Sequence, residues 1–409
     1  MHSDRSVTHP TSTAPLSARA LPLLIVGQIA LHGAMAGQRM AAPLQALQAG
    51  HSAWAVGVLL ALFAALPVLT AMAAGRMADR HGYHRPVHLA ITLTMLGAAC
   101  AVAACWLPGW WQFGLNCLGA AASGVGTHVG LIAIQRSASQ LAHSSTERLR
   151  VFSWLGMAPS LANVVGPVAA GLMIDAGGFA AAYMLLLLMP VVSIVVAHRV
   201  PRRPGPPRSV AREPGSSRWD LLTAPGMKRL LFVNWLLSAS WDVHSFAVPV
   251  LGHARGYNAS TIGLVLGVFT AAVTLVRFAI PMLAHRLREV TVLRTAMLLT
   301  GAVFAVYPFA GTPWAMGGCA ILLGLTLGAV QPMIMSTLHH LTPSHRHGEA
   351  IAFRSMAINF SSSVMPLVFG LAGTALGPGA LFWLMGAAVG GGSWAAAGLR
   401  KVFAGGPAA

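Results

Sequence analysis

Charged residues are scarce in this chain. Asp, Glu, Lys and Arg together make up 9% of its 409 residues, against roughly 25% in an ordinary soluble protein. Hydrophobic residues make up 56%, and the mean hydropathy is +0.68. So few charges could not cover the surface of a soluble fold of this length, whereas a surface that faces lipid needs none. The composition therefore excludes an ordinary soluble protein and predicts a membrane protein.

Acidic residues are the scarcest, with 9 against 26 basic residues and a net charge of +17. The basic residues are spread among apolar runs, and no basic stretch carries the interleaved aromatic residues that stack on bases. We therefore predict no nucleic-acid partner. The four cysteines also lie in apolar runs without metal-ligand spacing, so we predict small packing residues and no metal site; they are Cys100, Cys105, Cys117 and Cys319.

Motifs of catalysis and nucleotide binding are absent. The chain has no Gly-x-x-x-x-Gly-Lys-Ser/Thr segment, and neither of its two lysines, Lys228 and Lys401, lies in a glycine-rich loop. It has no His-Glu-x-x-His segment and no pair of acids inside an apolar run. We predict that the protein is not an enzyme, that it needs no cofactor, and that any energy it uses comes from a proton gradient.

Apolar runs long enough to span a membrane recur along the chain. A spanning helix needs about 20 mostly apolar residues. Twelve runs meet this requirement, at 20–43, 54–75, 86–106, 111–137, 151–174, 179–198, 228–251, 260–283, 291–310, 313–338, 351–375 and 380–400. We predict an all-α membrane protein with two six-helix bundles, at 20–198 and 228–400. A Pro-, Arg- and Gly-rich linker at 199–227 joins the bundles. A disordered tail at 1–19 precedes them, and a second tail at 401–409 follows them.

The basic residues are placed unevenly about these runs. If the N-terminus is cytoplasmic, 23 of the 26 lie in the tails, in the loops on the cytoplasmic side, or within a few residues of the run ends that border those loops. Arg255 alone lies on the other side, and Arg39 and Arg277 fall inside runs. Because basic residues stay preferentially in the cytoplasm, we predict that both termini are cytoplasmic. The abundance of arginine over lysine is typical of a GC-rich bacterial genome, so we predict a bacterial inner membrane.

The two halves of the chain repeat one another. A shift of 206 residues places His51–Arg80 on Tyr257–Arg286 without a gap. Small residues, proline and arginine coincide under this shift, in that Gly57 meets Gly263, Pro43 meets Pro249 and Arg80 meets Arg286. With six helices in each half, the repeat is parallel, and its axis lies along the membrane normal. The two bundles are therefore predicted to be pseudo-symmetric.

The loop between the second and third runs carries a recognisable motif. It reads Gly75-Arg76-Met77-Ala78-Asp79-Arg80-His81-Gly82-Tyr83-His84-Arg85. This resembles the Gly-x-x-x-Asp-Arg-x-Gly-x-x-Arg signature of the major facilitator superfamily. The resemblance implies the fold of that family, and a loop that latches the two halves in the outward-open state through Gly75, Asp79, Arg80, Gly82 and Arg85. The alternative is a charged loop that only fixes the topology.

A second, partial resemblance lies in the fifth run. The segment Gly166-Pro167-Val168-Ala169-Ala170-Gly171 is similar to the Gly-Pro-x-x-Gly-Gly motif of drug-exporting members of the family, with Ala170 in place of a glycine. The resemblance implies export, carried by Gly166, Pro167 and Gly171. The alternative is ordinary packing of small residues next to a proline kink.

Polar residues form a stripe on each of two symmetry-related runs. Gln28, His32 and Arg39 are spaced by four and seven residues in the first run, which places them on one helix face. The seventh run carries an equivalent set, namely Asn234, Ser238, Trp241 and Ser245. The shift of 206 superimposes these two stripes. Since the first and seventh helices line the central cavity in the family that the chain resembles, we predict that both stripes face a substrate cavity.

Asp242 is the only acid deep inside an apolar run. A buried charge is costly in a membrane and usually has a function. We therefore expect Asp242 to pair with Arg39 in one state, and to separate from it and bind a proton in the other. The alternative is a fixed, structural ion pair.

Three functions are compatible with these features. The first is a secondary transporter that exports a small organic solute, apolar or cationic, by proton antiport and alternating access. The second is a proton-coupled importer of a small anionic solute held by Arg39 and His32. The third is a membrane receptor or scaffold that transports nothing. The predicted partners are a small-molecule solute, protons and the lipid bilayer, and we expect a functional monomer.

Overall fold

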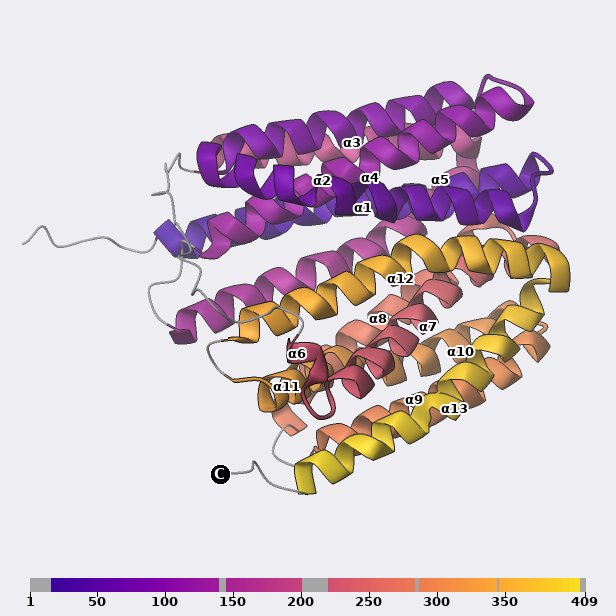
Figure 1. The fold of residues 1–409 in the computed structure, drawn as a ribbon. Coiled ribbons are helices and arrows are strands. Elements are labelled where there is room, and N and C mark those ends of the chain that lie inside the picture. The colour runs from indigo at the N-terminus through magenta and orange to yellow at the C-terminus, as the bar shows by residue number, and fades with distance from the viewer. Residues whose placement is uncertain (1–15, 140–144, 201–219, 284–286, 344–345, 405–409) are drawn as a thin grey trace, which may run out of the picture.

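The computed structural model describes the chain except residues 1–15, 140–144, 201–219, 284–286, 344–345 and 405–409 (Figure 1). The described residues form helices and no strands. In the N-terminal half these are α1 (Leu16–Gln48), α2 (Ala53–His81), α3 (His84–Ala104), α4 (Gly109–Ser139) and α5 (Ser145–Arg199). After the short α6 (Asp220–Thr223) come α7 (Met227–Ala254), α8 (Ala259–Leu283), α9 (Glu289–Val306), the 3-10 helix η2 (Tyr307–Phe309), α10 (Pro313–Gly328), α11 (Val330–Leu341), α12 (His347–Leu376) and α13 (Pro378–Ala404).

Ten of these helical segments are long and apolar enough to cross a membrane. One of them, in α5, runs for 46 residues, or roughly 69 Å at 1.5 Å per residue, about twice the apolar thickness of a bilayer. Gly178, with φ of 77°, breaks the α5 helix, so α5 crosses twice. The 28-residue α7 adds a further crossing, although its polar residues lower its hydropathy. The prediction of an all-α membrane protein with twelve spanning helices is confirmed.

Several predicted boundaries shift. Helix α1 begins at Leu16, inside the predicted tail, and continues through Pro43 to Gln48. The runs at 151–174 and 179–198 are joined in α5, and the run at 313–338 is divided between α10 and α11 at Ala329. Helix α6 lies in the predicted linker, and α13 extends past residue 400 to Ala404. Hydropathy alone marks where a chain can cross, whereas local turns and proline positions set where each helix starts and stops.

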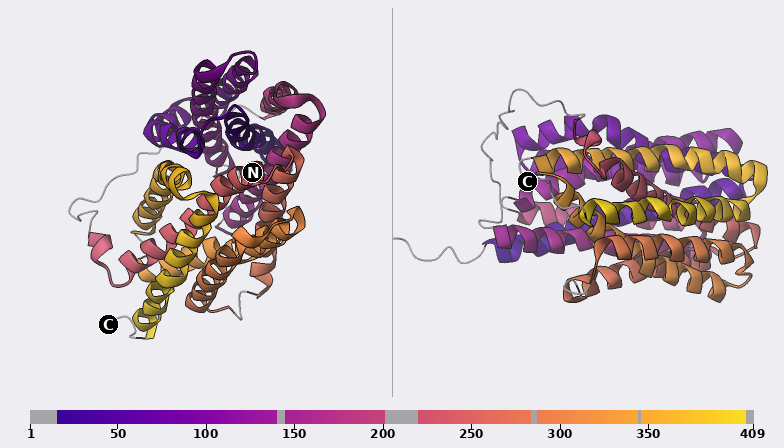
Figure 2. Two further views of the ribbon diagram at one scale, coloured as in Figure 1. Left: turned by 90° about the vertical axis from the view of Figure 1, so that its right-hand side faces the viewer. Right: turned by 60° about the horizontal axis from the view of Figure 1, so that its bottom comes forward.

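The two halves pack side by side as two bundles. In Figure 1 the N-terminal bundle runs from indigo to magenta and pink, and the C-terminal bundle runs from rose through orange to yellow; Figure 2 shows the same division from two further directions. Contacts across the halves are made mainly by α5 with α8 and by α2 with α12. Under the repeat, α2 corresponds to α8, and the first span of α5 corresponds to α12. The two contacts are therefore symmetry mates, which is the arrangement that a parallel repeat requires.

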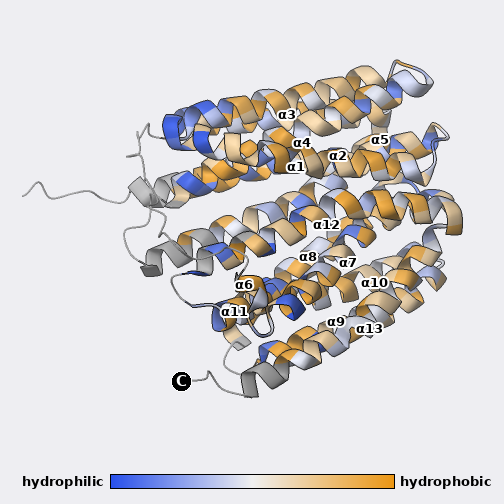
Figure 3. Cartoon of the chain, in the orientation of Figure 1, coloured by the Kyte–Doolittle hydropathy of each residue, from blue (hydrophilic) through white to orange (hydrophobic). Residues whose placement is uncertain are grey.

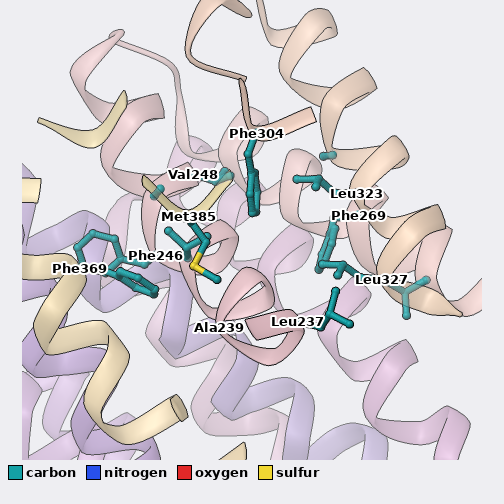
Figure 4. Close-up of a cluster of buried hydrophobic side chains, with 14 of the residues drawn as sticks. Leu237, Ala239, Phe246, Val248, Phe269, Phe304, Leu323, Leu327, Phe369 and Met385 are labelled. Atoms are coloured by element: carbon teal, nitrogen blue, oxygen red, sulfur yellow. The ribbon is translucent and has the colours of Figure 1, made fainter. Parts of the chain in front are cut away.

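Apolar side chains cover most of both bundles. Figure 3 shows hydrophobic residues along the middle of the helices and hydrophilic ones gathered near the end where the C-terminus lies. We call this end, where α1 starts and α13 finishes, the terminal end, and the other the opposite end. Inside the C-terminal bundle, aromatic residues from α7, α8, α9 and α12 form the core shown in Figure 4, which includes Phe246, Phe269, Phe304 and Phe369.

The halves touch most closely at the opposite end. A side chain added at Gly57 of α2 would collide with the Pro366 carbonyl of α12, and one added at Gly263 of α8 would collide with the Pro167 carbonyl of α5. Gly57 and Gly263 are the residues that the repeat superimposes. Because only glycine allows two helix backbones to approach so closely, these positions let both symmetry-related contacts close.

A carboxylate adds to this closure. Asp175 of α5 accepts hydrogen bonds from the backbone N–H groups of Ala259 (3.0 Å) and Ser260 (2.8 Å) at the start of α8. Asn258, which precedes α8, accepts from the N–H of Thr261 at 3.0 Å. The first N–H groups of a helix have no partner within it. Those of α8 are therefore capped jointly, by a residue of its own half and by a carboxylate of the other.

Candidate functional site: a cavity between the two halves

A cavity of about 340 Å³ lies between the halves, on the terminal side of the close contacts. Its walls come from α1, α5, α7, α8 and α12 and from the junction of α10 and α11. This volume lies in the range of small-molecule sites. Among the described residues in its walls, the ionisable side chains are those of Arg39, Arg277, Arg354 and Asp242.

Asp242 lies at the wall that α7 contributes, with 7% of its surface exposed. The hydroxyl of Ser361 donates to its Oδ2 at 3.0 Å, and that of Ser362 donates to its Oδ1 at 3.3 Å. Both serines belong to α12, so the carboxylate joins α7 to α12. Neither serine was predicted as a site residue, although a run of three serines at 361–363 inside an apolar segment was a usable signal.

Arg39 and Asp242 line the same cavity, but they are not in direct contact. No ion pair within 4.0 Å joins them, although each is in the electrostatic field of the other. This is the separated arrangement of the two that the sequence analysis envisaged for one state. Whether they pair in another state stays a prediction.

The polar stripe of α7 largely faces this cavity. Asn234, Ser238 and Trp241 are in its walls. Ser245 lines a smaller neighbouring cavity of about 40 Å³, and Arg39 and Trp241 belong to both cavities. Arg39 and Ser245, which the repeat superimposes, therefore meet across the interface of the halves.

The other two residues of the α1 stripe lie apart from the cavity. Gln28 is fully buried, and no described residue bonds to its side-chain amide. His32 approaches Asn163 of α5, with 3.4 Å between Nε2 and Nδ2. Asn163 lines the cavity, so His32 lies behind its wall. The spacing of the stripe predicts which residues share a face of α1. It does not predict at which helical turns this face packs against α5 and at which it lines the cavity.

Two cavity arginines lie nearer the terminal end. Arg277 of α8 donates from Nη1 to the hydroxyl of Ser160 (2.9 Å) and from Nη2 to the side-chain oxygen of Gln331 (3.1 Å). Arg354 of α12 is 8% exposed. In the sequence, Arg354 lies a few residues inside the run at 351–375, and it is one of the basic residues assigned to the cytoplasmic side. Nothing in the pattern of residues distinguished it from a topology signal.

The motif loop engages its own half. Arg136 of α4 donates from Nε to Oδ1 of Asp79 at 2.9 Å and from Nη2 to the Asp79 carbonyl at 3.2 Å. Arg80 and Arg85 are exposed, and Gly82 ends α2 with φ of 67°. Gly75 has open space where a side chain would stand. The partner of Asp79 in this conformation is therefore an arginine side chain of its own half.

The motif of α5 lies in two helix contacts. A side chain at Gly166 would lie 2.8 Å from the backbone nitrogen of Gly37 in α1, and one at Gly171 would lie 2.5 Å from the Ala259 carbonyl in α8. Pro167 meets Gly263, as described above. The segment therefore packs α5 against both its own bundle and the other one. No metal site adds to this picture, since the described residues include no group of three or more His, Cys, Asp or Glu side chains that could hold an ion.

Known proteins share this architecture. The model of the Major Facilitator Superfamily matches residues 24–229 and 230–402. The chain belongs to the Major Facilitator Superfamily. It is therefore a multi-pass membrane transporter, with a small-molecule solute and the lipid bilayer as its partners, and membership of this family indicates a transporter and not an enzyme.

Among relatives in this superfamily are two tetracycline resistance proteins. The class B protein of Escherichia coli is 24% identical over 326 residues, which cover 76% of this chain and 77% of the relative. The class G protein of Vibrio anguillarum is 28% identical over 341 residues, with 78% and 80% coverage. These relatives support the resemblance to drug-exporting members.

Solved structures confirm the superfamily fold. A bacterial homologue of the iron transporter ferroportin, in an inward-facing state, superimposes with a TM-score of 0.74 at 15% identity, covering 93% of this chain and 98% of that one. A POT family transporter in complex with a thioalcohol-conjugated peptide gives 0.71 at 12% identity, covering 95% and 96%.

Proposed function

We propose that this chain is a proton-coupled exporter of a small organic solute, which works by alternating access in a bacterial inner membrane with both termini in the cytoplasm. Its relatives are named for resistance to tetracycline, and resistance by a transporter of this fold implies outward transport. With the termini inside, the structure corresponds to a state closed on the outside, with the cavity on the cytoplasmic side of the closure.

The observation that carries the proposal is the position of Asp242. Among the described residues that line the cavity it is the one carboxylate, it is held by two serine hydroxyls, and it lies apart from Arg39. A carboxylate without a partnered cation in a low-dielectric site is well suited to bind a proton. In the proposed cycle, Asp242 carries the proton in this state and releases it when it pairs with Arg39 in the other.

Transport in proteoliposomes tests this. An imposed pH gradient should drive accumulation of at least one of tetracycline, phenyl phosphate and benzyltrimethylammonium. Asp242→Asn should abolish the gradient-driven part and preserve solute exchange at equal pH, because the amide keeps the serine contacts but cannot titrate. Glu289→Gln is the matched control, since Glu289 lies at the start of α9, outside the cavity. Full gradient coupling in Asp242→Asn would refute the mechanism.

The direction of transport is tested in the same vesicles. An exporter loads its solute from the cytoplasmic side, so vesicles with the termini outward should accumulate solute when the lumen is acidic. Accumulation only under the reverse gradient would support the alternative, a proton-coupled importer of an anionic solute. The proposed unit is a monomer, and a loss of gradient-driven transport per unmodified chain on mixing with Asp242→Asn protein would contradict that.

A further inference from the structure

The cavity carries an imbalance of charge. Its walls hold three guanidinium groups, those of Arg39, Arg277 and Arg354, against the single carboxylate of Asp242, which leaves a net charge of +2 when Asp242 is ionised. Burying a charge without a counter-charge is strongly unfavourable. Water in the cavity or an anion bound in it therefore compensates this charge during the transport cycle.

Arg354 is the clearest of the unpaired cations. More than nine-tenths of its surface is buried, and its Nε has no acceptor. None of the hydrogen bonds and ion pairs of the described residues involves its side chain. An arginine presents five N–H donors in a planar fork that matches a carboxylate or a phosphate. Arg354 lines the cavity, and no described residue accepts a hydrogen bond from its side chain.

Arg277 is held beside it by neutral partners. Ser160 and Gln331 each accept one hydrogen bond from its guanidinium, which fixes the orientation of the group without neutralising its charge. Arg277 and Arg354 are close enough to repel one another. An anion between the two guanidinium groups would relieve this repulsion, because it can accept charge-assisted hydrogen bonds from both.

Asp242 does not serve as their counter-ion. Its oxygens accept from Ser361 and Ser362, and it forms no ion pair within 4.0 Å with any cavity arginine. The cation whose field acts on it is Arg39. Asp242 is therefore coupled to Arg39, whereas Arg277 and Arg354 line the same cavity without a carboxylate partner among the described residues.

We propose that Arg277 and Arg354 bind the anionic group, a carboxylate or a phosphate, of the transported solute. This inference rests on the proposed transport function and adds the charge of its substrate. A cationic solute, which the sequence analysis favoured together with an apolar one, would meet a repulsive field in this part of the cavity. The ring of Trp241 in the same cavity offers a flat apolar surface for the rest of the solute.

Direct binding to the purified full-length chain in phosphatidylcholine nanodiscs tests the site. Phenyl phosphate and phthalate should bind, and benzyltrimethylammonium should not. Arg354→Gln and Arg277→Gln should each weaken anion binding by about 10- to 100-fold, the loss expected for a hydrogen bond to a charged group. Arg354→Lys should recover part of it, because a lysine restores the charge but not the fork.

The matched control is Arg294→Gln, which removes the same charge from an exposed position on α9. It should leave anion binding within about twofold of the unmodified chain, since exposed charges are screened by solvent and salt. Elution as a single peak in size-exclusion chromatography shows that each variant is folded. If Arg354→Gln fails this check, Arg277→Gln carries the test.

The anion could be supplied by a soluble solute or by a lipid headgroup. Nanodiscs that contain phosphatidylglycerol distinguish the two. If this lipid weakens the binding of phenyl phosphate, and Arg354→Gln removes that effect, the site binds a headgroup phosphate. If the affinity for phenyl phosphate is unchanged by the lipid, the site binds a soluble anion. The proposal is overturned if neither anion binds in either lipid, if the cation binds as tightly as the anions, or if the arginine variants bind anions like Arg294→Gln.

Failure of this site differs from failure of the proposed function. Gradient-driven transport of benzyltrimethylammonium that is insensitive to Arg354→Gln would overturn the anion site and leave proton-coupled transport in place. Arginine-dependent binding of phenyl phosphate without gradient-driven transport of any tested solute would overturn the transport function and leave the anion site in place.

Discussion

Replacing Asp175 with Ala should loosen the closure at the opposite end. The carboxylate caps the first two N–H groups of α8 from the other half of the protein. Loss of a helix cap costs about 0.5–2 kcal/mol, and the charge adds about 0.3–1 kcal/mol through the helix dipole. Because Asp175 is exposed, we expect the low part of this sum, about 1–2 kcal/mol. Only the closed state contains these bonds, so the equilibrium should move roughly 5- to 30-fold towards opening at this end.

Hydrogen exchange measured by mass spectrometry reports this directly. In Asp175→Ala, the amides of Ala259 and Ser260 should exchange about 5- to 30-fold faster. Asp175→Asn should fall between, since its amide oxygen accepts a bond without charge. Asn258→Ala is the control: it removes the bond to Thr261 within one half and should leave the first two amides protected. Unchanged exchange at Ala259 and Ser260 in Asp175→Ala would refute the reasoning.

Two further predictions concern the contact and the loop of α2. Gly57→Val should lower the melting temperature, because its side chain would collide with Pro366 and overpacking costs about 1–3 kcal/mol. Gly75→Ala, at an open position on the same helix, should leave the melting temperature unchanged. Equal melting temperatures of the two variants would contradict a closed contact at Gly57. Arg136→Gln should change the free energy of unfolding by less than about 1 kcal/mol, since its partner Asp79 is 70% exposed and exposed ion pairs contribute little. A larger loss of unfolding free energy in chemical denaturation would show that the ion pair stabilises the fold.

The sequence predicted the fold well because a membrane imposes strong rules. Apolar runs of spanning length and uneven basic loops carry most of the information, and the repeat added the correspondence of the halves. The pairing of Gly57 with Gly263 under the shift anticipated two equivalent contacts. The break at Gly178 inside α5 was expected only as a short loop, because hydropathy does not record whether a turn interrupts a helix.

The site could be predicted only in part. Spacing along α7 identified the face of Asn234, Ser238 and Trp241, since helical periodicity fixes which residues share a face. It could not show that Gln28 is buried within its own bundle, because the rotation of α1 against α5 depends on packing between helices. Arg354 could not be predicted as a site residue for another reason. Near a helix end, a basic residue that only sets the topology and one whose side chain lines a cavity have the same sequence context.

Helix α12 carries both Arg354 and Ser361. Seven residues separate them, which is about two turns or roughly 10.5 Å along one face. The serine that holds the carboxylate of Asp242 and the arginine proposed to hold the solute are thus fixed to a single rigid rod. Any rotation of α12 that withdraws the serine from Asp242 also displaces the arginine, so occupancy by a proton and occupancy by a solute are mechanically linked through one helix, with no relay of side chains between them.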